Sequence, residues 1–182
     1  MSGINAKLLS ATCALCLAFA AVQPAQADTL VIVETPSTTY RTPSWGIGLM
    51  LGEPTGLSIK RYLGRDALHL YLGGAYGPGL RVGVDYLFGL AQLHDGRNAS
   101  VDLFVGVGGF AGALRGPCDG INNWQGTCNG DGYLGARMPI GLELRFRKAP
   151  ISLGLEMAPG LAFAAGRSGL LVDADFALRV LL

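Results

Sequence analysis

The sequence contains few charged residues, and the two signs are almost balanced. Charged side chains make up 15% of the 182 residues, against about 25% in ordinary soluble domains. There are 14 basic and 13 acidic residues, so the chain has no basic field that would hold nucleic acid. The low charge is unsuited to an ordinary soluble surface, and nucleic acid is excluded as a partner.

Long apolar runs are missing as well, except near the start of the chain. After residue 27 no stretch of 18 apolar, uncharged residues occurs, so no transmembrane helix is expected. Residues 1–27 have the pattern of a signal peptide: a basic Lys7, the apolar run "LLSATCALCLAFAAV" and the cleavage pattern "AQA". We therefore expect an exported protein whose mature chain begins at Asp28.

Cysteine is scarce, and the signal peptide contains two of the four residues. The exported chain keeps Cys118 and Cys128, ten residues apart in a polar stretch. In an exported protein such a pair predicts a disulfide bond. A redox or metal-binding pair would need closer spacing or further ligands, so no cofactor and no metal site is expected.

Histidine is limited to His69 and His94. His94 falls in a predicted turn, and His69 has no serine neighbour in the evident register of its own or the next strand. Nucleophilic catalysis needs a base beside the nucleophile. The sequence therefore predicts a protein that is not an enzyme.

Glycine, by contrast, is abundant, with 28 residues, and most of the exported chain alternates between apolar and other residues. A period of two is typical of β-strands. The predicted strands are Ser44–Gly52, Leu57–Leu63, Ala67–Ala75, Leu80–Phe88, Ser100–Ala113, Gly132–Phe146, Ile151–Phe163 and Gly169–Leu182. We expect an all-β, eight-stranded antiparallel up-and-down meander over residues 44–182, after a periplasmic lead-in over residues 28–43.

The first predicted turn has a distinct motif. It comprises Gly52, Glu53, Pro54, Thr55 and Gly56. Proline at the second and glycine at the fourth position of Glu53–Gly56 predict a type I turn. The polar connection from Arg115 to Gly132 is much longer than the other turns, and we expect it to be an extracellular loop.

One face of the predicted strands is apolar, and the other combines glycine with charge. The charged residues of the second face are Lys60, Arg81, Asp85, Asp102, Arg137, Glu143, Arg145, Glu156, Asp173, Asp175 and Arg179. A soluble barrel would expose this glycine-rich face, whereas soluble surfaces are built mainly from long polar side chains. In lipid, a basic residue at the midplane costs about 2–4 kcal/mol. If all eleven charges faced lipid, their summed free-energy cost would exceed the stability of a typical fold, which is about 5–15 kcal/mol.

The sequence therefore predicts a transmembrane β-barrel in the bacterial outer membrane, with the apolar face toward lipid and the charges in the lumen. The five basic and six acidic lumen residues suit a paired network that closes the lumen, whereas a selective pore would favour one sign. A structural or surface-interaction role follows, with an extracellular or periplasmic partner. The alternatives are a narrow channel or hydrophobic-ligand transporter and, third, a lipid-modifying outer-membrane enzyme.

Several segments also match a known family in order. The runs "LGEPTGLSIKRYL", "DYLFGL", "ARMPIGLELRF" and "LEMAPGLAF" resemble a family of small bacterial outer-membrane proteins marked by a G-E-P-T-G-L-S turn. The likeness extends over about residues 45–182. It implies an OmpA-type eight-stranded barrel that contacts outer-membrane lipid and, during biogenesis, the barrel-assembly machinery, and it implies no particular activity.

Overall fold

The strands of the computed structural model follow the alternation in the sequence. The structure describes residues 43–75, 79–117, 121, 127–164 and 167–182. The predicted signal peptide lies outside these residues, as does the lead-in segment except for its last residue. The strands are β1 (Trp45–Glu53), β2 (Thr55–Leu63), β3 (Asp66–Gly74), β4 (Leu80–Asp95), β5 (Ala99–Pro117), β6 (Thr127–Arg137), β7 (Ile140–Phe146), β8 (Ile151–Ala164) and β9 (Arg167–Leu181).

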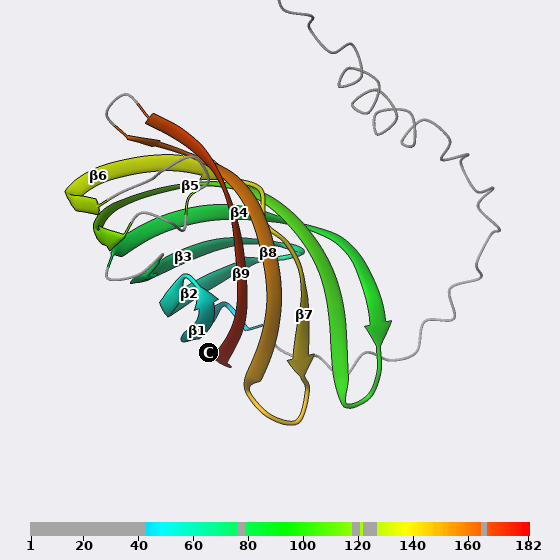
Figure 1. Cartoon of the computed structure of the whole chain (residues 1–182). Helices are drawn as coiled ribbons and strands as arrows, with labels where there is room; N and C mark the ends of the chain where they lie inside the picture. The colour runs from blue at the N-terminus through cyan, green and yellow to red at the C-terminus, as the bar shows by residue number, and fades with distance from the viewer. Residues whose placement is uncertain (1–42, 76–78, 118–120, 122–126, 165–166) are drawn as a thin grey trace, which may run out of the picture. The chain divides into compact units, whose positions relative to one another are not determined.

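All nine of these strands belong to one antiparallel sheet. Most strands pair with the strand that follows them in the chain, and β5 and β8 each pair with both β6 and β7. β1 pairs with β2 on one side and with β9 on the other, so the order of pairings returns to its starting point (Figure 1). No helix in the described part of the chain is long and apolar enough to cross a membrane.

The predicted sixth strand is divided into β6 and β7 at Pro139, which is why nine strands replace the expected eight. Proline has no amide hydrogen and cannot donate to a strand ladder. The register nevertheless continues across the break, because Arg137 lies opposite Gly108 and Ile140 lies opposite Val105. β7 therefore continues the path of β6 along the same neighbours.

Two hairpins extend farther than the sequence predicted. β4 continues past Phe88 to Asp95, and β5 continues to Pro117. β6 already begins at Thr127, so part of the predicted loop over residues 115–132 is strand. Backbone groups in a hairpin hydrogen-bond each other whatever the polarity of the side chains, and the apolar alternation alone did not define these ends.

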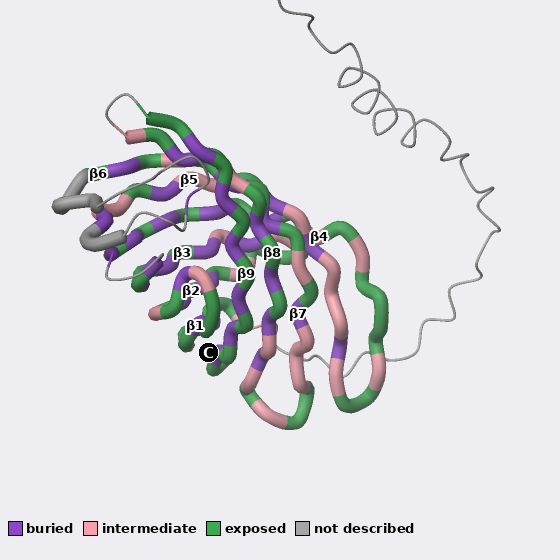
Figure 2. The backbone as a smooth tube through the Cα atoms, in the orientation of Figure 1, coloured by how far each residue is buried: buried purple, intermediate pink, exposed green. Residues whose placement is uncertain are grey.

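Burial alternates along each strand, as Figure 2 shows. In β9, Asp173 and Arg179 are buried, whereas Val172 and Phe176 are exposed. Across the described residues 31 large hydrophobic side chains are exposed, and the largest fully buried side chains are two arginines. This distribution reverses the usual one, in which arginine is rarely buried and large apolar surfaces are covered.

Aromatic rings on the inner face lie over glycines of the neighbouring strand. The cross-strand partners are Tyr71 and Gly83, Phe104 and Gly141, Phe110 and Gly135, and Tyr133 and Gly112. A methyl group on any of these glycines would overlap the opposite ring. Glycine therefore provides the space in which large side chains lie flat along the inner face of the sheet.

Candidate functional site: the buried charge network

Arg137, the last residue of β6, is the centre of a group of buried ion pairs. Its guanidinium donates two hydrogen bonds to Asp85 of β4, from Nε to Oδ1 at 3.0 Å and from Nη2 to Oδ2 at 2.5 Å. It also contacts Glu156 of β8 at 3.0 Å and Asp173 of β9 at 3.2 Å. None of these four residues is more than 5% exposed. A single planar cation thus connects carboxylates from three other strands.

A second arginine and two aromatic rings complete this group. Arg81 of β4 lies 2.8 Å from Asp173. The ring of Tyr71 lies 4.2 Å from the Arg137 guanidinium, and the ring of Phe110 lies 4.9 Å from that of Arg81. Aromatic faces attract guanidinium groups, most strongly where water is excluded. The rings over glycine therefore also contact the buried charges.

A second group of ion pairs surrounds Glu143 of β7. Lys60 of β2 donates to its Oε2 at 2.8 Å, and the Tyr62 hydroxyl donates to its Oε1 at 2.6 Å. Arg179 of β9 lies 3.7 Å from the same Oε1. Two cations and a phenol from β2 and β9, neither of which pairs with β7, thus converge on one buried carboxylate.

Ser58 and His69 connect the two groups. The Nε of Arg179 donates to the Ser58 hydroxyl at 2.7 Å, and that hydroxyl lies 3.0 Å from Nε2 of His69. A serine was not expected in the register of the strand of His69 or of the next strand, and Ser58 lies on the preceding strand, β2. The direct partner of His69 in β2 is Lys60, and Ser58 reaches the ring diagonally, as residues on one face of a sheet can.

The order Ser58, His69, Asp85 is that of a serine hydrolase triad. The Ser58 hydroxyl, which accepts from Arg179, shares a hydrogen bond with Nε2 of His69, and the other ring nitrogen is Nδ1. That atom lies 3.5 Å from Asp85, beyond an ordinary hydrogen bond. Asp85 is bonded to Arg137 instead, and all three triad residues have 0% exposure.

His69, Asp85 and Glu156 also bring three potential metal-ligand atoms within 4.8 Å of one another. The guanidinium of Arg137 already lies between the two carboxylates, at hydrogen-bonding distance from both. It provides the positive charge that a metal ion would bring, and it hydrogen-bonds both carboxylate oxygens of Asp85. The three residues do not fit a metal site while Arg137 is in place.

Glu156 and Asp175 form a pair of like charges. They are register partners on β8 and β9, and both are at least 95% buried. Within the described residues, Oδ2 of Asp175 has no hydrogen-bond partner. Like charges directly opposite each other destabilise a sheet, so this pair is expected to oppose folding.

Two of the eleven predicted network residues are less buried than the other nine. Asp102 and Arg145 pair with each other at 2.6 Å, and both side chains are 22% exposed. They line a pocket of about 260 Å³ that also contacts Tyr62, Lys60 and Glu143. The other nine predicted residues are buried.

The turn motif differs from the predicted type I turn. β2 begins at Thr55, and the hydrogen-bonded segment is Gly52–Thr55. The Thr55 hydroxyl donates to the Gly52 carbonyl at 2.6 Å and accepts from its amide at 3.1 Å. The Glu53–Pro54 bond is cis, and Gly52 has a φ of 133°. The turn is therefore centred one residue earlier than predicted.

The predicted disulfide stays a prediction. Cys118 lies outside the described residues. The backbone of Cys128 belongs to β6, opposite Gly116, and the position of its side chain is not described.

Sequence reasoning missed five polar or aromatic residues of the network. They are Ser58, Tyr62, His69, Tyr71 and Phe110. Each lies on the inner face of its strand, the face on which the alternation places the predicted charges, so the period of two did carry a signal. The contacts between them depend on register, which alternation does not define.

The chain matches no protein-family model, no curated protein and no solved structure.

Proposed function

We propose that this protein is a small integral β-barrel of the bacterial outer membrane, exported with a cleaved signal peptide, whose lumen is closed by the buried charge network. Its role is structural or in surface interaction. The observation that carries the proposal is the reversed distribution of side chains: nine charged residues of the predicted network are buried, and 31 large hydrophobic residues are exposed. Lipid is the solvent in which an apolar exterior is favourable.

The sheet supports the same proposal. A membrane-spanning sheet must satisfy its backbone groups internally, which requires that it have no free edge. The pairing of β1 with β9 returns the sheet to its start. In this interpretation β6 and β7 together form one of eight barrel strands. The resemblance to outer-membrane proteins with the G-E-P-T-G-L-S turn is consistent with it.

Membrane placement is tested on protein purified from the cell envelope in detergent. The mature chain should begin at Asp28. It should also migrate faster on a gel before heating than after, because a closed barrel stays compact until it is unfolded. Recovery in the soluble periplasmic fraction would contradict the proposal.

Closure of the lumen is tested by conductance in a planar lipid bilayer. Wild-type protein should show little steady current, because Glu143 and Arg137 connect the walls across the interior. Glu143→Ala should lower stability and open occasional small currents. Arg147→Ala is the matched control, since Arg147 pairs with Asp95 at an exposed site. Steady, ion-selective current through wild-type protein would favour a channel instead.

The Ser58–His69 contact favours one second candidate, a hydrolase that acts when the interior opens. A fluorophosphonate probe should then label Ser58 in protein whose interior is open to the probe. His69→Ala should abolish this labelling. We expect no labelling of the closed wild-type barrel, since both side chains have 0% exposure. Labelling of wild-type protein that depends on His69 would establish the hydrolase and overturn the closed-lumen role.

A further inference from the structure

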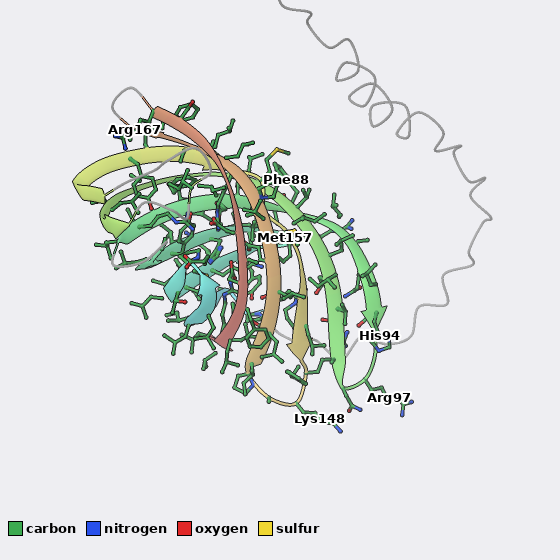
Figure 3. The ribbon with its side chains drawn as sticks, viewed as in Figure 1. Phe88, His94, Arg97, Lys148, Met157 and Arg167 are labelled. Atoms are coloured by element: carbon green, nitrogen blue, oxygen red, sulfur yellow. The ribbon has the colours of Figure 1, made fainter. Side chains whose placement is uncertain are left out.

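One end of the sheet has a group of exposed basic residues, which we call the basic rim. Its members are Arg61, Arg65, Arg97, Arg147 and Lys148. They lie at the end of β2 and in the β2–β3, β4–β5 and β7–β8 turns, which share one end of an antiparallel sheet. Figure 3 shows Arg97 and Lys148 at this end and Arg167 at the opposite end.

Contacts between neighbouring turns connect the members of the basic rim. Arg65 donates to the carbonyl of Leu90 in β4 at 3.3 Å. The backbone amide of Arg147 donates to the carbonyl of Asn98 at 2.9 Å, and its side chain pairs with Asp95. The β2–β3 turn thus contacts β4, and the β7–β8 turn contacts the β4–β5 turn.

The charge of this end is strongly one-sided. Among its described exposed or partly exposed turn residues the acids are Asp66 and Asp95, against the five basic residues of the rim. Asp66 accepts a hydrogen bond from the Tyr86 hydroxyl, and Asp95 pairs with Arg147. At the opposite end, the exposed or partly exposed charged residues whose side chains the structure describes are Glu53 and Arg167. Among the described side chains, the excess positive charge therefore lies at the rim.

Arg61 connects the rim to the apolar exterior. It is exposed on the outer side of β2. Ile59 and Leu63, which lie next to it on the same face of the strand, are also exposed. Its register partner is Trp45, whose ring lies 5.3 Å from the guanidinium. Arginine and tryptophan together are typical of the level of lipid headgroups.

We infer that the basic rim binds the headgroups of anionic phospholipids, with the Arg61 guanidinium contacting a phosphate while Trp45 packs against the upper part of the acyl chains. This inference rests on the proposed membrane location. Arginine is suited to phosphate because its planar fork donates two parallel hydrogen bonds. A basic residue close to an anionic lipid surface strengthens binding about fivefold.

Brominated lipids test the inference directly, because bromine quenches a tryptophan only on contact. Trp124→Phe leaves Trp45 as the sole reporter among the two tryptophans of the chain. The protein is reconstituted in vesicles that contain a fixed share of brominated phosphatidylglycerol or brominated phosphatidylcholine. We expect stronger quenching by the anionic lipid, a relative affinity reduced about fivefold by Arg61→Gln, and a further decrease when Lys148→Gln is added.

Arg167→Gln at the opposite end is the matched control and should leave the preference unchanged. Equal quenching by the two lipids would overturn the inference while leaving the protein in the membrane. An anionic preference that survives both rim substitutions would overturn it too. Absence of quenching by either lipid would contradict the proposed membrane location itself, so the two failures are distinguishable.

Discussion

Arg137 and Arg145 occupy the same path through the sheet, on β6 and β7, and each faces inward and pairs with an aspartate from another strand. Arg137 is 2% exposed and contacts Asp85, Glu156 and Asp173. Arg145 is partly exposed beside a pocket and contacts Asp102. A buried charge that loses its partner keeps its full desolvation cost, whereas water can replace the partner of an exposed one. The two arginines should therefore differ sharply in their importance for stability.

The largest effect is expected for Arg137→Ala. The substitution leaves three buried carboxylates without their shared cation, and removing one partner of a buried pair costs about 3–5 kcal/mol. Urea unfolding of the protein in detergent or vesicles, followed by the gel mobility of the folded form, measures the free energy of unfolding. A loss below about 1 kcal/mol would show that water already hydrates this group.

A smaller loss is expected for Gly83→Ala. The added methyl group would overlap the Tyr71 ring, which is 2% exposed and cannot move without losing its contact with Arg137. Overpacking of this kind costs about 1–3 kcal/mol. Gly109→Ala is the matched control, because a methyl group there would lie 3.5 Å from its nearest neighbour, the Gly135 carbonyl oxygen, which is ordinary van der Waals contact. Equal losses from both substitutions would argue for a general glycine effect rather than for the ring.

Asp175→Asn should raise the free energy of unfolding by about 0.2–1 kcal/mol, because it removes a like charge opposite Glu156. Asp173→Asn provides the comparison with the opposite sign. Asp173 pairs with both Arg81 and Arg137, so its neutralisation should destabilise the protein. The same unfolding assay measures both variants, and a loss of stability in Asp175→Asn would mean that its carboxylate is needed by the neighbouring arginines.

The smallest effect is expected for Arg145→Ala. Partly exposed ion pairs contribute about 0–1 kcal/mol, and solvent reaches both Arg145 and Asp102 through the pocket. Unfolding of this variant should therefore differ from wild type by no more than that amount. A cost close to that of Arg137→Ala would remove the distinction between the buried and the partly exposed arginine.

The alternation predicted which residues would be buried better than it predicted where strands would end. Asp173 and Arg179 were placed on the inner face from the sequence, and they are buried there. The extension of β5 to Pro117 depends on backbone pairing with β6, which leaves no mark in side-chain polarity. Pro139 could be seen in the sequence as a possible break in the strand. That the register continues across the break depends on the neighbouring strands β5 and β8, which pair with both β6 and β7.

The network itself was predictable as a set of residues and not as a set of contacts. Lys60 and Glu143 are 83 residues apart in the chain, so their pairing depends on how the whole sheet is arranged. Ser58 and His69 were missed for a related reason. Their contact is diagonal, and the choice between direct and diagonal contacts is made by side-chain packing that alternation does not describe.

The aromatic rings over glycine have a consequence for the way this sequence can change over time. Tyr71 and Gly83 share one volume on adjacent strands, so a larger residue at position 83 is compatible with the fold only beside a smaller one at position 71. Whether a substitution at one of these two positions is tolerated therefore depends on the residue at the other. Among diverged descendants of this chain, positions 71 and 83 should vary jointly, with their combined side-chain volume changing less than the volume at either position.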